Sequence, residues 1–140
     1  MEKAFEVNII TPGKLAITAE IQSLHTKSKD GEVEFRRNHT PIILSTVPAV
    51  TKIVKADGSS EIYFTSSGVV VIKNNVIRFC CDSAEKPEDI DINRAMEAKE
   101  RAEARIKKYN RSDTEMDIDR AMLALAKANA RIEAVNIYKN

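Results

Sequence analysis

Four cationic side chains in the C-terminal part of the chain have the types and the spacing to bind an anion. Arg94 and Arg101 lie two helical turns apart in one predicted helix, and Lys127 and Arg131 lie one turn apart in the next. If the helices run antiparallel, these side chains converge, and the guanidinium fork matches phosphate oxygens. Spacing alone favours the plainer alternative, a solvated charged face with ion pairs inside each helix.

Two acidic residues, Asp91 and Glu85, lie just before these cations and supply acceptors for an amine or a ribose hydroxyl. No catalytic constellation accompanies them. The histidines, His25 and His39, have no titratable partner close in sequence, and the chain contains neither a Walker-type loop nor a nucleophile elbow. The residues therefore indicate a non-enzymatic binding or regulatory protein with no catalytic residue.

The adjacent cysteines Cys80 and Cys81 are expected to be reduced thiols at the end of a strand. Neighbouring cysteines rarely bridge each other because the geometry is strained. They also lack the spaced partner ligands of a zinc site, so no metal site is predicted.

Two helices must position the cationic residues. The stretch "DIDINRAMEAKERAEARI", Asp89–Ile106, is predicted to be a helix with Asp91 as its N-cap. A polar turn, "YNRSD", follows at Tyr109–Asp113, and Asp117 or Asp119 is predicted to cap a second helix. So short a connection implies an antiparallel hairpin.

Alanine dominates the faces by which these helices would meet. The predicted contact positions are Ala95, Ala98, Ala102, Ile106 and Tyr109 in the first helix, and Ile118, Ala121, Leu125, Ala128, Ile132 and Val135 in the second. A methyl-sized group contributes about 0.8 kcal/mol on burial, against about 1.5–3 kcal/mol for leucine. Pairs such as Glu97–Arg101 add only tenths. The hairpin is therefore expected to dock reversibly, unless the alanines serve only to permit tight packing.

The first half of the chain has the period-two pattern of half-buried strands, as in Phe5, Val7 and Ile9. Turn sequences such as "KDG" and "ADG" recur about every ten residues. The sequence predicts a two-part α+β protein. A β-sandwich or flattened barrel of antiparallel strands would occupy residues 1–84 and an α-helical hairpin 85–140, with a linker at about 83–90.

Composition excludes several classes of partner. The formal net charge is +1, so no overall field attracts nucleic acid or an acidic membrane. The chain lacks tryptophan, and aromatic residues are 5% of the total, which argues against base-stacking platforms. No stretch approaches the roughly 20 apolar residues of a membrane span, and the N-terminus lacks a signal-peptide pattern. Direct insertion into a membrane is therefore not expected.

Four motifs occur in order along the chain: "FEVNIITPGK", "KDGEVEFRRNHTPII", "SSGVVVIKNNVIRFCCDSAE" and "EDIDINRAMEAKERAEARI". Together they resemble the epsilon subunits of bacterial F-type ATP synthases. The first is similar to that family's first strand and turn, and the others to its "GELG…GHxPL", "SGGxxEVxxxxVxxLADxAE" and "DIDxxRAxxAxxRAExRL" segments. The departures are Glu34, Asn38 and Ser67, each in place of a family glycine. Asparagine tolerates a positive φ, so the turn at Asn38 is expected to survive.

The resemblance implies a non-catalytic rotor subunit in the central stalk, peripheral on the cytoplasmic face of the cell membrane. Its partners would be the gamma subunit, the polar loops of the c-ring through Glu32, Phe35 and His39, and the alpha and beta subunits through an extended hairpin. Extended, the hairpin of this family blocks ATP hydrolysis. Two alternatives stay open: a stalk subunit whose hairpin never senses nucleotide, and a free-standing β-sandwich binding module with a helical oligomerisation tail.

The resemblance also implies ATP as a regulatory ligand of the folded hairpin, with no cofactor required. Carried over by position, the ligand residues would be Glu85, Ile90, Asp91, Arg94, Ala95, Arg101, Lys127 and Arg131. Lys127 replaces a family arginine, so it keeps the charge and loses the bidentate fork.

Overall fold

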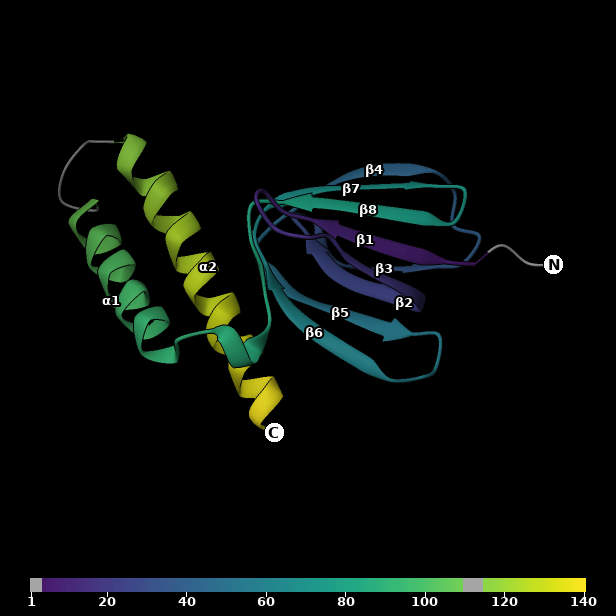
Figure 1. The fold of residues 1–140 in the computed structure, drawn as a ribbon. Helices are drawn as coiled ribbons and strands as arrows, with labels where there is room; N and C mark the ends of the chain where they lie inside the picture. Colours follow the sequence, from purple (N-terminus) through teal and green to yellow (C-terminus); the bar gives the residue numbers. More distant parts are fainter. Residues whose placement is uncertain (1–3, 110–114) are drawn as a thin grey trace.

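The computed structural model describes residues 4–109 and 115–140 and divides them into a strand-rich part followed by two helices (Figure 1). The strands are β1 Glu6–Ile10, β2 Ile17–Ser28, β3 Gly31–Arg36, β4 Ile42–Thr46, β5 Ala49–Lys55, β6 Ser60–Thr65, β7 Gly68–Lys73, β8 Val76–Cys81 and β9 Ala84–Glu85. A short 3-10 helix, η1 Pro87–Asp89, leads to α1 Ile92–Tyr109 and α2 Glu115–Lys139. The predicted fold class, a β-sandwich followed by a helical hairpin, is confirmed.

The long strand β2 joins the two layers of the sandwich. Its first half pairs with β1, and its second half pairs with β3 on one side and β5 on the other. The strand order is β1-β8-β7-β4-β2-β5-β6-β9, with β3 beside β2. The pairs are antiparallel except β1–β8, which is parallel, a detail that the alternation of apolar residues could not reveal.

The apolar alternation directs one side of each strand into a shared core. Leu24 of β2 lies opposite Phe35 of β3 and Ile53 of β5, and all three are at most 2% exposed. Val7 and Phe79 are fully buried in the same cluster. Residues between these positions face outward, which leaves the outer faces available for contacts with other elements.

The turns follow the predicted chemistry. Asn38 has φ 63°, so asparagine does take the left-handed conformation for which glycine is usual, as predicted. Its backbone N–H donates to Asn75 Oδ1 at 2.7 Å, which ties this turn to the β7–β8 turn. The cysteines also behave as predicted: both are free thiols at the end of β8, with Cys80 exposed and Cys81 buried.

One predicted helix start is confirmed and the other is wrong. Asp91 Oδ1 accepts the backbone N–H of Arg94 at 3.2 Å, which is an N-cap bond for α1. Neither Asp117 nor Asp119 begins the second helix, because α2 already starts at Glu115. No glycine or proline separates these residues, and acidic side chains are favourable within a first helical turn. The predicted "YNRSD" turn lies largely outside the described residues.

The second helix buries two faces. Ala121, Ala128 and Val135 are buried at the spacing predicted for the contact with α1. Ala130 and Ala134 are also buried, and they pack against Phe64 of β6. Consequently α2 lies between α1 and the strands, and the hairpin is folded beside the sandwich (Figure 1). Among the described helices, none combines the length and the apolar character required to cross a membrane.

Candidate functional site

A pocket of about 400 Å³ lies where the last strand of the sandwich, the linker and both helices meet. It is lined by Glu85, Asp89, Ile90, Asp91, Arg94, Ala95, Ala98, Arg101 and Arg131. Seven of the eight positions carried over from the resemblance are therefore gathered in one place. The convergence of Arg94 and Arg101 with Arg131 agrees with the antiparallel arrangement of the helices.

Each wall of the pocket comes from a different element. The short strand β9 pairs with β6 and supplies Glu85. The N-cap Asp91 fixes the start of α1, which places Arg94 one turn and Arg101 three turns into the helix. Ala95 is only 4% exposed, and its small side chain lets α2 approach closely enough to supply Arg131.

The Arg131 side chain is held by two residues of the sandwich. Its Nε–H donates to Glu85 Oε1 at 3.0 Å and to Oε2 at 3.3 Å. Its guanidinium carbon lies 4.4 Å from the centroid of the Phe64 ring, a cation–π distance. Both charged side chains are largely shielded, with 29% of Arg131 and 23% of Glu85 exposed. Shielding strengthens this ion pair relative to one on the open surface.

The two arginines of α1 have a different environment. Both Arg94 and Arg101 are exposed, and no acidic side chain among the described residues forms an ion pair with either. The expected intrahelical pair between Glu97 and Arg101 is thus not formed there. The geometry weakens the plainer alternative of a charged face neutralised within each helix, and it leaves two cations facing a common space.

Lys127 does not join the pocket, although its position was carried over with the others. It is half-buried on α2, one turn before Arg131, but it does not line the pocket. Helical spacing placed it near the arginines, and the rotation of α2 that buries Ala130 and Ala134 against the sandwich decides which side chains reach the site.

Sequence reasoning missed three residues of the site. Asp89 and Ala98 line the pocket beside the predicted positions. Ala98 lies one turn after Arg94, so helical spacing could have found it, whereas Asp89 lies in η1, before α1 begins. Phe64 was treated as part of an alternating strand. Its segment, Tyr63 to Ser66, is in fact buried without interruption, which is the pattern of a strand covered on both faces.

The end of α2 is tied to the linker by a separate polar contact. A hydrogen bond from the Tyr138 hydroxyl to Glu88 raises the pKa of that phenol above its ordinary value of 10.0. Nearby, hydrogen bonds from Lys55 and Tyr63 lower the pKa of Glu61. The Tyr63 hydroxyl donates to Glu61 Oε2 at 2.5 Å, so this carboxylate is held ionised between its two donors.

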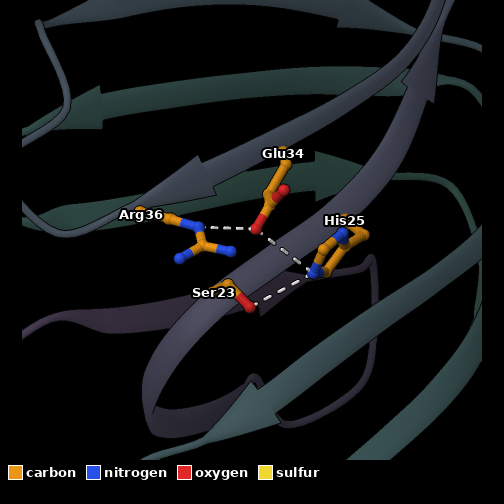
Figure 2. Close-up of polar contacts among 4 residues, drawn as sticks. All are labelled: Ser23, His25, Glu34 and Arg36. Atoms are coloured by element: carbon orange, nitrogen blue, oxygen red, sulfur yellow. Dashed lines mark hydrogen bonds and ion pairs between the residues drawn. The ribbon is translucent and has the colours of Figure 1, made fainter.

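A second, larger cavity of about 680 Å³ lies between α2 and the outer face of β2, β3 and β5. Beside it, Ser23, His25, Glu34 and Arg36 form a polar row across β2 and β3 (Figure 2). Ser23 Oγ lies 3.2 Å and Glu34 Oε1 3.7 Å from the same imidazole nitrogen, Nε2 of His25. In a nucleophilic triad the nucleophile and the orienting acid contact opposite ring nitrogens of the histidine, so this row is not such a triad.

The structure corrects one predicted contact residue. Glu32 and His39 lie at or near the surface, but Phe35 is only 2% exposed and belongs to the core of the sandwich. It follows the inward alternation of β3, opposite Leu24. Its ring meets that of His39 edge-on, with centroids 5.2 Å apart, so Phe35 supports His39 from within instead of facing a partner.

Both parts of the structure, the strands and the helices, match known family models. Residues 4–87 match the family described as "ATP synthase, Delta/Epsilon chain, beta-sandwich domain", and residues 88–136 match "ATP synthase, Delta/Epsilon chain, long alpha-helix domain". The ATP synthase epsilon chain of Clostridium perfringens (strain SM101 / Type A) is 43% identical over 109 residues, 78% of this chain and 80% of the relative. The chain belongs to the ATP synthase epsilon family.

Other epsilon relatives agree with this membership. The ATP synthase epsilon chain of Clostridium botulinum (strain Okra / Type B1) is 41% identical over 107 residues, 76% of this chain and 80% of that one. The family resemblance read from the sequence motifs is thereby confirmed.

Two solved structures share the fold of this epsilon-family chain. A chain of the Euglena gracilis mitochondrial ATP synthase has a TM-score of 0.78 at 15% identity, covering 100% of this chain and 83% of that one. A chain of the Tetrahymena thermophila mitochondrial ATP synthase, from a structure of the central stalk and c-ring, has a TM-score of 0.68 at 13% identity, covering 96% and 98%. At these identities the likeness concerns the fold.

Proposed function

We propose that this epsilon-family chain is a non-catalytic central-stalk subunit whose hairpin restrains ATP hydrolysis and senses ATP in its folded position. The pocket of Arg94, Arg101, Arg131 and Glu85 carries the proposal. Its walls come from α1, α2 and the sandwich at once, so it is complete only while the hairpin lies against the strands. A ligand of this pocket therefore favours the folded over the extended hairpin.

The chemistry of the pocket suits a nucleoside triphosphate. Arg94 and Arg101 provide cations without ion-pair partners among the described residues. Asp89 and Asp91 provide acceptors for ribose hydroxyls or an exocyclic amine. Guanidinium groups bind phosphate oxygens in a bidentate manner, and this favours a phosphate-bearing ligand over a simple carboxylate of equal size.

ATP titration of the isolated protein tests the sensor. We expect calorimetry to show binding at millimolar or lower ATP, with protection against thermal unfolding. Arg94→Ala should abolish both signals because the pocket loses one of its cations, while the matched control Arg105→Ala should bind normally, because Arg105 is an exposed α1 arginine outside the pocket lining. No heat and no protection in the wild type would instead favour a stalk subunit that does not sense nucleotide.

The restraint on hydrolysis needs the assembled enzyme. Deletion of residues from 88 to 140 removes the helical part that we propose as a separate domain and should leave the strands and their partners in place. ATP hydrolysis should then become faster while assembly is retained. An unchanged rate in the assembled enzyme would show that the hairpin does not restrain ATP hydrolysis.

An exposed apolar face of the sandwich is the proposed contact for the gamma subunit. Strand register places Ile10, Cys80 and Val69 in one row across β1, β8 and β7. In the next row Val71 lies between Ile43 of β4 and the exposed Arg78 of β8, which borders the apolar side chains. Ile43 is 74% exposed, and Ile10 and Val69 are each 40% exposed. Apolar side chains gathered in this way are typical of protein interfaces.

Co-purification with gamma tests this surface and the stalk assignment together. Ile43→Lys should weaken co-purification because it puts a charge in place of the most exposed of these apolar side chains. The control Gln22→Lys changes an exposed residue of β2 and should have no effect. A wild-type chain that never associates with gamma would favour the free-standing binding module.

A further inference from the structure

The pocket arginine of α2 is oriented by an aromatic ring that does not itself line the pocket. Phe64 is fully buried, and the guanidinium carbon of Arg131 lies 4.4 Å from its ring centroid. Phe64 and Glu85 are direct partners in the β6–β9 register, so their side chains lie on one face of the sheet. The same face holds both contacts of Arg131.

These contacts leave the outer edge of the guanidinium unused. Glu85 accepts both of its hydrogen bonds from the Nε–H of Arg131, at 3.0 and 3.3 Å. The ring of Phe64 lies 4.4 Å from the guanidinium carbon. The Nη groups form no hydrogen bond to Glu85, and they are the fork that binds a phosphate in a bidentate manner.

We propose that Phe64 is a positioning residue of the nucleotide pocket: it holds the Arg131 guanidinium so that its Nη edge meets an anion shared with Arg94 and Arg101. The proposal rests on the proposed nucleotide site and explains how one of its cations is oriented. An ion pair to Glu85 alone leaves the guanidinium able to rotate, whereas contact with the buried ring of Phe64 restricts its orientation.

The position of Phe64 makes ligand binding depend on the docking of α2. The same ring packs against Ala130 and Ala134, the residues by which α2 contacts the strands. If α2 leaves β6, Arg131 loses its ring and its carboxylate partner in one step, while Arg94 and Arg101 remain on α1. Because coupling between two equilibria is reciprocal, an anion that needs the oriented Arg131 must stabilise the docked helix.

A purely structural role for Phe64 makes a different prediction. Phe64 also fills space between β6 and α2, so its truncation would loosen docking whatever residue stood at 131. The positioning role and the structural role are distinguished by changing Phe64 in two proteins, one with arginine at 131 and one with lysine at 131. Lysine at 131 keeps the charge, so that binding stays measurable, and it lacks the planar group that stacks on the ring.

The experiment is a double-mutant cycle of ATP affinity, measured by calorimetry on the full chain. Phe64→Leu should weaken ATP binding about two- to thirtyfold, the range of a cation–π contact. Phe64→Tyr keeps the ring and should bind within twofold of the wild type. In the Arg131→Lys background, Phe64→Leu should cost less than twofold.

Each outcome bears on the proposal. If Phe64→Leu binds like the wild type, or costs the same factor with lysine at 131, the positioning role is overturned and the nucleotide site remains. If the wild type itself binds no ATP, the nucleotide site and this proposal fall together. Amide exchange in the sandwich checks that each variant is folded, and Phe64→Met, of similar volume without a ring, replaces Phe64→Leu should that variant not fold.

Discussion

The contact between α2 and the strands is small enough for one added side chain to disrupt it. Ala134 is fully buried and Ala130 is 5% exposed, both against the buried ring of Phe64. At about 0.8 kcal/mol for each methyl and about 1.5–3 kcal/mol for the ring, this cluster contributes about 3–5 kcal/mol to docking. The substitution Ala134→Leu inserts three carbons into a space that holds none.

Overpacking of this kind costs about 1–3 kcal/mol, because neighbouring side chains must leave their preferred rotamers. The docking equilibrium of α2 should therefore shift towards the free helix by about 5- to 150-fold. Amide hydrogen exchange on the isolated protein measures this directly. Amides of α2 should exchange faster by that factor, while those of β1, β8, β7 and β4, on the other layer of the sandwich, should keep their rates.

A matched control separates docking from a general effect on the helix. Asn136→Leu places the same side chain two residues further along α2, at an exposed position, and should leave exchange unchanged. If Ala134→Leu also left the exchange of α2 unchanged, or if wild-type α2 exchanged as slowly as the sheet with and without ATP, docking would not be the weak, reversible contact described here.

Three further predictions concern single residues. Burial raises the pKa of the Cys81 thiol from 9.0 to about 11. Between pH 7 and 9, iodoacetamide should therefore label only the exposed Cys80 of the folded protein, as detected by mass spectrometry. The rate of Cys81 labelling should rise about tenfold per pH unit up to pH 11. Asp91→Ala removes the N-cap bond and should lower the stability of α1 by about 0.5–2 kcal/mol, seen as faster exchange in its first turns, while Asn93→Ala should not. A Cβ at Gly68 would lie 2.2 Å from the Cys80 carbonyl oxygen, so Gly68→Ala should lower the free energy of unfolding in urea by about 1–3 kcal/mol.

Much of the fold could be predicted from local sequence patterns, namely apolar alternation and helix-capping residues. Alternation in the first half predicted strands because an inward position such as Val7 is apolar while its neighbours Glu6 and Asn8 are not. Asp91 predicted a helix start because a carboxylate there satisfies a backbone N–H that the helix leaves free. These features depend on residues within a few positions of each other, and this is why sequence reasoning reached them.

The features that sequence reasoning missed depend on contacts distant in sequence. Whether Lys127 or Arg131 reaches the pocket is decided by the rotation of α2 on the strands, which Ala130 and Phe64 set together. Phe35 alternates with the polar Glu34 and Arg36, which is the pattern of an inward position; the family resemblance had assigned it to a partner surface instead. Spacing along one element cannot determine its rotation against another.

The energy of docking is of the same order as that of the proposed ligand binding, which gives the alanines a role beyond tight packing. A contact worth about 3–5 kcal/mol keeps α2 against the strands in the absence of ligand. A ligand at one hundred times its dissociation constant adds about 2.7 kcal/mol to the state that binds it. The small contact made by alanine at 130 and 134 keeps the two terms comparable. Because Arg131 contacts the sandwich through Phe64 and Glu85 and also faces the pocket, it is the side chain through which these two terms act on one another.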